Sequence, residues 1–342
     1  MNNRDTNIEL LRLVLMSFIV LWHFLVHGMG LLSDNAYCNG GDIPMTHIIV
    51  MALICYHVDC FVFISGYYGV SLSLKKIIFL LTQVIFYSVC TYFTAKYLFG
   101  QPLSIDFWKL FFPISTDMYW FFTDYFWLIL LCPFLNECER VGKSRMMFII
   151  ILLFIVYIGG VRYVLDMINL RFCLFVFLYL LGRYLRKYPF GNRTFYIWLW
   201  FLSIFLLIIA VFLYFSRGIL GAGNVNHLLT NVNPIVISAA VSFFYIFQGF
   251  RIKSVKLINW FASGCFAVYL MTDGPFMPFY NKVVLSIFGT NVAVLICISV
   301  IIVLTISMVE NMRNKVFSPI NNLCLRTIMK IKCLCDESRL FR

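Results

Sequence analysis

Long apolar runs alternate with short charged or Gly-, Pro- and Asn-containing gaps along most of the chain. A helix that crosses a membrane needs about 20 mostly apolar residues, and breakers between such runs separate one helix from the next. The pattern predicts an all-α, polytopic integral membrane protein with about ten transmembrane helices. We place these spans near residues 8–28, 44–68, 77–98, 117–136, 145–161, 170–187, 194–215, 232–249, 259–280 and 290–309.

The composition supports this reading and limits the domain organisation. Of 342 residues, 62% are hydrophobic and only 12% are charged, which is too few polar side chains to cover a soluble globule. We expect one membrane domain at 1–310 and a basic cytoplasmic tail at 311–342. The tail mixes apolar residues with cations, which indicates either a segment on the anionic inner leaflet or a partly disordered basic tail.

The net charge of +12 indicates an orientation rather than a nucleic-acid partner, because the basic residues form short clusters between apolar runs. Cytoplasmic connections retain Lys and Arg during insertion. One side collects 20 of the 27 basic residues, so we predict that both termini are cytoplasmic. These 20 are Arg4, Lys75, Lys76, Arg140, Lys143, Arg145, Arg183, Arg186, Lys187, Arg193, Arg251, Lys253, Lys256, Arg313, Lys315, Arg326, Lys330, Lys332, Arg339 and Arg342.

The twelve cysteines form no CxxC pair and lie mostly in apolar segments, where cysteine behaves as a small hydrophobic residue. We therefore expect neither a disulfide framework nor a metal site.

The first span contains three ionisable residues, Glu9, Arg12 and His23. At about 100° per residue, Arg12 and His23 fall within roughly 20° of one helix face, and Glu9 shares that face three residues before Arg12. An ionisable group in hydrocarbon costs several kcal/mol unless it is paired or hydrated. A single buried histidine can serve only to hydrogen-bond a neighbouring helix, but three polar groups on one stripe indicate a functional site.

Other buried polar residues are predicted to lie at a similar depth. Counting about 1.5 Å per residue from the cytoplasmic ends puts His23, His57, Asp124 and Asp273 all roughly 16 to 23 Å into the membrane. We expect these four side chains to converge in one polar chamber, with Asp59 about half a turn closer to the cytoplasm.

The end of the second span has two interpretations. Ser65 and Gly66 favour close helix packing as much as a direct chemical role. Lys75 and Lys76, which follow at the inner face, are typical of a charge pair that sets topology or of an anion site.

Several separated segments resemble acyltransferase family 3, a family of membrane acyltransferases. The opening NIELLRLVLMSFIVLWH resembles the family's Arg-x10-His motif at Arg12 and His23, and HVDCFVFISGYYG is similar to its second-span pattern. LKKIIFLLTQVIFYS, MYWFFTDYFWLILLCPFLN and FLYLLGRYLRKY resemble later motifs in the same order. The likeness covers about residues 4 to 310. One position differs, because Thr272 precedes Asp273 where many members have a histidine.

The resemblance implies transfer of an acetyl group from cytoplasmic acetyl-CoA to a hydroxyl of a cell-surface or lipid-linked glycan, without a metal. On that basis we assign catalytic roles to His23, Glu9, Arg12 and Asp59, and donor binding to Arg12, Lys75 and Lys76. The predicted acceptor-binding residues are His57, Trp120, Asp124 and Asp273.

The resemblance also implies a location in the bacterial cell membrane, with the lipid bilayer, acetyl-CoA and the glycan acceptor as partners. A homo-oligomer is compatible with the sequence. The alternative functions are a transporter or flippase for a lipid-linked or anionic sugar, in which the same buried ionisable groups would gate a pathway, and a membrane scaffold in glycan assembly.

Overall fold

The computed structural model describes residues 5–31, 45–98, 100, 105–163, 170–217, 228–229, 231 and 233–340, and this part of the chain folds into helices. The named helices are α1 (Thr6–Trp22), η1 (His23–Gly28), α3 (Met45–Ile54), α4 (His57–Tyr68), α5 (Leu74–Phe93), η2 (Thr94–Leu98), η3 (Phe107–Phe111), α6 (Trp120–Glu137), η4 (Cys138–Val141), α7 (Lys143–Tyr163), α8 (Leu170–Lys187), α9 (Arg193–Arg217), α11 (Pro234–Gln248), α12 (Lys256–Ala262), α13 (Cys265–Thr272), η5 (Gly274–Phe276), α14 (Met277–Phe288) and α15 (Val292–Leu340).

Five helical stretches in the described residues are long and apolar enough to cross a membrane. They are Thr6–Gly28, Thr46–Tyr68, Leu74–Tyr97, Arg193–Leu213 and Val292–Pro319. Each corresponds to a predicted span, and the shorter apolar helix α11 (Pro234–Gln248) corresponds to a sixth. The all-helical prediction is therefore confirmed, while the count of ten stays a prediction.

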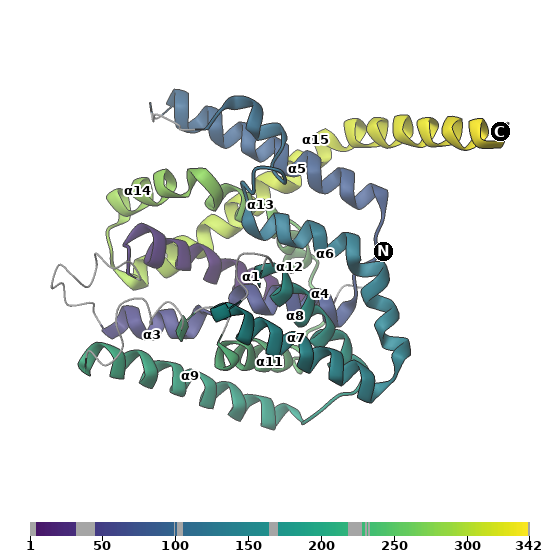
Figure 1. Cartoon of the computed structure of the whole chain (residues 1–342). Coiled ribbons are helices and arrows are strands. Elements are labelled where there is room, and N and C mark those ends of the chain that lie inside the picture. The colour runs from purple at the N-terminus through teal and green to yellow at the C-terminus, as the bar shows by residue number, and fades with distance from the viewer. Residues whose placement is uncertain are drawn as a thin grey trace.

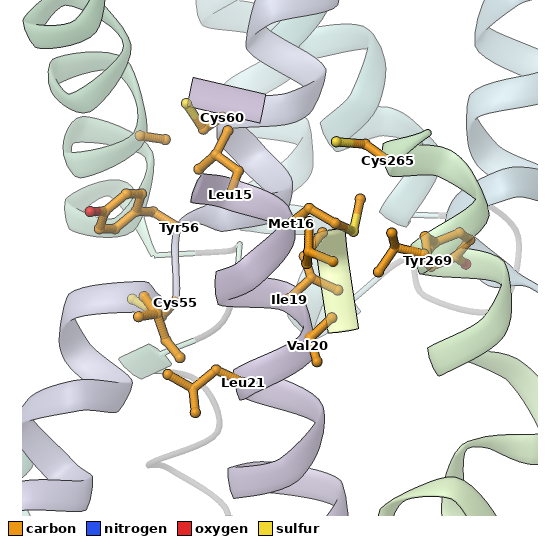
Figure 2. Packing of buried hydrophobic residues seen from close by; sticks show 14 of the residues in the cluster. Leu15, Met16, Ile19, Val20, Leu21, Cys55, Tyr56, Cys60, Cys265 and Tyr269 are labelled. Atoms are coloured by element: carbon orange, nitrogen blue, oxygen red, sulfur yellow. The ribbon is translucent and has the colours of Figure 1, made fainter. Parts of the chain in front are cut away.

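Helix α1 lies inside the bundle and packs against α4, α11, α12, α13 and α15 (Figure 1). Its two sides have different neighbours. Figure 2 shows Leu15 and Leu21 on the side of Cys60 and Cys55, whereas Ile19 points toward Tyr269 on α13. Because buried apolar residues surround α1 on both sides, a polar group on this helix is held in a fixed position.

Helices α4 and α8 approach each other closely because each has a glycine at the contact. A Cβ atom on Gly66 would lie 2.3 Å from the backbone oxygen of Tyr179, and one on Gly182 would lie 2.6 Å from the backbone nitrogen of Tyr67. These separations are shorter than van der Waals contact. The packing interpretation of Gly66 is thus confirmed.

Two predicted spans are interrupted, which corrects the expectation of continuous helices there. The second span breaks at Cys55 and Tyr56 between α3 and α4. The run predicted at 259–280 divides into α12, α13, η5 and α14. The break between α13 and α14 lies at Gly274, which has a φ of +74° and is followed by Pro275. Glycine adopts a positive φ without steric cost, and proline lacks the backbone N–H that a helix interior uses, so both residues commonly interrupt helices.

A buried ion pair fixes α15 against α5. Glu310 accepts hydrogen bonds from Gln83 Nε2 (3.0 Å) and Tyr87 Oη (2.7 Å) and from Arg313 Nε and Nη2 (2.7 Å each). The Arg313 guanidinium also lies over the rings of Phe86 and Tyr87. Burying charges stabilises a fold only when such additional hydrogen bonds satisfy them.

The predicted domain boundary at 310 lies within α15 and stays a prediction. Glu310 and Arg313 belong to the packed bundle, and α15 continues as one helix to Leu340. Figure 1 shows its C-terminal half extending away from the other helices. Most side chains of the predicted tail lie outside the described residues, so its expected contact with the inner leaflet stays a prediction.

Candidate functional site

A cavity of about 520 Å³ lies along α1 and η1, between these helices and α4, α6 and α13. It runs from Arg12 to His27, which is about 20 Å along the helix axis. The described residues lining it are Arg12, Met16, Ile19, Trp22, His23, His27, Cys55, His57, Val58, Phe61, Ser65, Leu80, Trp120, Phe121, Tyr125, Leu229, Asn231, Ala262, Ser263, Cys265, Phe266, Tyr269 and Asp273. Arg12 and His23 of the expected polar stripe therefore line this cavity.

At the predicted cytoplasmic end, Arg12 Nη1 donates to Glu9 Oε1 at 2.9 Å, and Glu9 is buried. A guanidinium has five N–H donors, so the pair orients Arg12 while leaving donors for a ligand. Across the cavity, the hydroxyls of Ser65 and Tyr125 hydrogen-bond at 3.1 Å. Ser65 thus lines the cavity, which the packing interpretation alone did not predict.

His23 begins a π-helical turn, a distortion that is frequent at functional sites. Asn281 Nδ2 donates to the His23 backbone oxygen at 3.1 Å. The turn also fits closely against α14, since a Cβ atom on Gly28 would lie 2.9 Å from a methyl carbon of Leu285. Contacts with α14 therefore fix the backbone of this turn at His23 and Gly28.

The His23 ring is buried and hydrogen-bonds the backbone of Thr272. Its Nδ1 atom has no hydrogen-bond partner among the described residues. A neutral imidazole has one donor and one acceptor nitrogen, so one ring nitrogen can orient the ring while the other stays available for chemistry. His27 follows one turn later, with its ring centroid 5.9 Å from that of His23.

Asp273 faces His23 and His27 and interacts electrostatically with both. Its carboxylate also hydrogen-bonds Tyr269, whose hydroxyl accepts from the backbone N–H of Phe121 at 3.2 Å. Residue 273 follows the end of α13 and precedes the left-handed Gly274. The break in the ninth predicted span therefore turns a carboxylate toward the histidines.

His57 and Trp120 complete the polar and aromatic walls. His57 Nδ1 lies 2.6 Å from the Ile54 backbone oxygen, and its ring lies 5.5 Å from that of Trp22. Trp120 starts α6 and has the Arg171 guanidinium over its ring, 5.7 Å from the centroid. The cavity therefore offers hydrogen-bonding groups beside flat apolar rings.

The expected convergence of four residues holds for His23, His57 and Asp273 but is wrong for Asp124. Asp124 lines a separate hollow of about 400 Å³ with Trp127 and Phe172, and its carboxylate is 3.5 Å from Arg171 Nε. The side of α6 that carries Phe121 and Tyr125 lines the main cavity, whereas Asp124 lies beside it, against Arg171.

Asp59, Lys75 and Lys76 are not among the described residues that line the cavity. Asp59 is fully buried, and neither carboxylate oxygen has a hydrogen-bond partner in the described part of the chain. Both lysines are exposed. Lys76 Nζ donates to Ser71 Oγ at 2.7 Å, and Leu80, which does line the cavity, lies one helical turn after Lys76.

The sequence reasoning assigned no role to Tyr269, Tyr125 or Asn281. Tyr269 was detectable, since it lies one helical turn before Asp273 and the Gly274-Pro275 break follows at once. Asn281 was not, because its contact with the His23 backbone depends on the path of the chain after that break.

The model of an acyltransferase domain, acyltransferase family 3, matches residues 5–309. The chain belongs to this acyltransferase family. No curated protein and no solved structure matches the chain. The family and the apolar helices together make the protein a membrane acyltransferase, which confirms the resemblance found in the sequence. The family assignment gives no support to a transporter or flippase.

Proposed function

We propose that this acyltransferase moves an acetyl group from cytoplasmic acetyl-CoA to a hydroxyl of a cell-surface or lipid-linked glycan. The observation that supports this most directly is the cavity from Arg12 to His27 with His23 along its wall. Its length of about 20 Å compares with a hydrocarbon thickness of about 30 Å. A donor from one side and an acceptor from the other can therefore meet near His23.

The proposed step breaks the thioester C–S bond of the donor and forms an ester C–O bond with the sugar. A hydroxyl is a weak nucleophile at neutral pH, so His23 takes its proton, and the proton then goes to the departing thiolate of CoA. In the alternative route, His23 attacks the thioester and holds the acetyl group transiently before the hydroxyl takes it. Both routes need a ring nitrogen with a free lone pair, and Nδ1 is the candidate.

The neighbours of His23 suit this role. Asp273 is a positioning residue, because its charge stabilises a positively charged imidazole on the step in which His23 holds a proton or an acetyl group. Tyr269 hydrogen-bonds that carboxylate, and the backbone N–H of Phe121 donates to the Tyr269 hydroxyl. The aromatic face of Trp120 and the polar edge of His57 are the proposed acceptor-binding groups.

The donor is assigned to the Arg12 end. Twenty basic residues, including Lys75 and Lys76, lie on the predicted cytoplasmic side, where CoA is found, and charge-assisted contacts suit its phosphates. Lys76 is the better placed of the two lysines, since it precedes cavity-lining Leu80 by one turn on the same helix face.

Replacing Arg12 by glutamine is expected to raise the acetyl-CoA concentration needed for half-maximal rate about tenfold or more. Each lost charge-assisted contact costs roughly 1.5 to 3 kcal/mol. Lys76→Gln should act in the same direction, and Lys75→Gln, on a different helix face from Leu80, should have the smaller effect. Donor and acceptor dependence are measured separately on membrane-inserted protein. An unchanged donor curve for both Arg12→Gln and Lys76→Gln would remove the donor site from this end.

We also propose a multi-pass location in the bacterial inner membrane with both termini cytoplasmic, as the basic residues indicate. In intact cells, an impermeant thiol reagent should modify Cys38 and should not modify an engineered cysteine at Arg339, each tested with the other cysteines replaced. Protection of Cys38 together with labelling at 339 would invert the topology and place the donor on the wrong side.

The function itself is tested with purified protein and acetyl-CoA. We expect release of free CoA thiol that depends on a glycan acceptor, and loss of O-acetyl resonances from the surface glycan of a deletion strain by NMR. Absence of acetyl-CoA turnover with all surface glycans of the host would contradict the proposed donor.

A further inference from the structure

A second hollow, of about 390 Å³, lies at the predicted cytoplasmic end of α1. One wall comes from the start of α1 and the last residue of α4, and the other comes from the segment joining α11 to α12. The residues used below are Asp5, Asn7, Tyr68, Phe250 and Arg251. None of them has a role in the acyl-transfer step.

The walls of this hollow are tied together by hydrogen bonds. Asn7 Nδ2 donates to the backbone oxygens of Phe247 (3.0 Å) and Gln248 (3.2 Å), and the Val255 N–H donates to Thr6 Oγ1 at 3.1 Å. These bonds join chain segments about 240 residues apart. The hollow is therefore held open by the fold and needs little rearrangement to accept a ligand.

The two hollows follow the same pair of helices. Asp5 directly precedes α1 and lines the outer hollow, while Arg12, about two turns into the same helix, lines the cavity. On α4, Ser65 lines the cavity and Tyr68, three residues later, lines the hollow. A long ligand that lies along α1 and α4 can occupy both.

The chemistry of the outer hollow differs from that of the cavity. Arg251 is exposed and has no carboxylate within ion-pair distance among the described residues, so its guanidinium is available for a phosphate. Tyr68 and Phe250 supply aromatic rings on which a base can stack. Asp5, which accepts from Tyr68 Oη at 3.0 Å, offers an acceptor for amino or hydroxyl groups.

We propose that this outer hollow is the nucleotide subsite of the acyl donor, which binds the adenosine and 3′-phosphate end of CoA while the pantetheine arm passes Arg12 into the cavity. The proposal rests on the proposed acetyl-CoA donor. The phosphate goes to Arg251, and the base lies against Tyr68 and Phe250. The negative charge of Asp5 faces the amino and ribose hydroxyl groups, which are hydrogen-bond donors.

The decisive comparison uses two donors. Arg251→Gln should raise the KM for acetyl-CoA about tenfold, because one charge-assisted phosphate contact is lost. The same variant should leave the KM for S-acetylpantetheine unchanged, because that donor has the same thioester arm but no nucleotide. Lys253→Gln is the matched control, since Lys253 is an exposed cation of the same segment outside the hollow. Equal effects of Arg251→Gln on both donors would overturn the subsite.

Direct binding separates this inference from the proposed function. Adenosine 3′,5′-bisphosphate should bind purified wild-type protein in calorimetry, compete with acetyl-CoA, and bind Arg251→Gln about tenfold more weakly. If acetyl-CoA is turned over while the nucleotide binds wild type and Arg251→Gln equally, the subsite is wrong and the donor stands. If neither acetyl-CoA nor the nucleotide binds, both are wrong.

Discussion

We expect the His23→Ala variant to lose acyl transfer activity and still to accumulate in the membrane. The ring faces the cavity, hydrogen-bonds the Thr272 backbone and interacts electrostatically with Asp273, so its removal deletes the proton acceptor or acyl carrier. General-base catalysis contributes about 10² to 10⁴ in rate, and that is the size of the loss we predict. The measurement is CoA release by purified protein at saturating donor and acceptor.

Two control variants make this result specific. His47→Ala removes another buried histidine, on α3, whose ring is not among the described residues of the cavity and whose Nε2 lies 3.3 Å from the Thr290 backbone oxygen. It should keep most activity. His27→Ala should cost less than His23→Ala, because His27 is exposed at the far end of the cavity. Near-wild-type turnover by His23→Ala would end its catalytic assignment.

Replacing Gly66 by valine should prevent folded protein from accumulating. Its Cβ atom would lie 2.3 Å from the Tyr179 backbone oxygen and 2.7 Å from the Tyr179 Cα, and backbone atoms of a packed helix cannot move aside singly. Forcing extra atoms into a packed contact costs about 1 to 3 kcal/mol and occasionally more. We expect the loss here at or above about 3 kcal/mol, measured as thermal stability and monodisperse yield in detergent.

An exposed small residue on another helix provides the comparison. Ser286 lies exposed on α14, and its hydroxyl donates to the Val283 backbone oxygen of the same helix. A valine there enters no packed contact between helices. Ser286→Val should therefore yield nearly as much folded protein as wild type. A Gly66→Val protein with wild-type stability would mean that α4 and α8 can separate without loss, contrary to the packing described here.

The part of the site that lies on one helix was predictable from the sequence. Arg12 and His23 share a face because helical periodicity alone determines it over eleven residues, and the Glu9–Arg12 contact at 2.9 Å follows from the i, i+3 spacing. Depth estimates also brought His57 and Asp273 to the level of His23. Hydropathy also located the five long apolar helices. Like helical periodicity, it depends only on residues that are close together in the sequence.

The incorrect predictions concern properties that depend on more than one segment of the chain. Depth does not fix helix rotation, so Asp124 was placed in the chamber although it faces Arg171 at 3.5 Å. Apolar length does not reveal an internal break, so the run at 259–280 was expected to be continuous. Asn281 reaches the His23 backbone only because α14 returns beside η1, a long-range contact that depends on the whole fold.

The buried pair at Glu310 and Arg313 has a consequence for biosynthesis. Gln83 and Tyr87 belong to an early apolar segment, yet their carboxylate partner is made more than 220 residues later. Until the last span is inserted, these two polar groups have no Glu310 to bind, and a chain cut short before residue 310 never obtains it. The final helix thus completes assembly of the bundle, and premature termination leaves polar groups in the membrane for quality-control proteases to recognise.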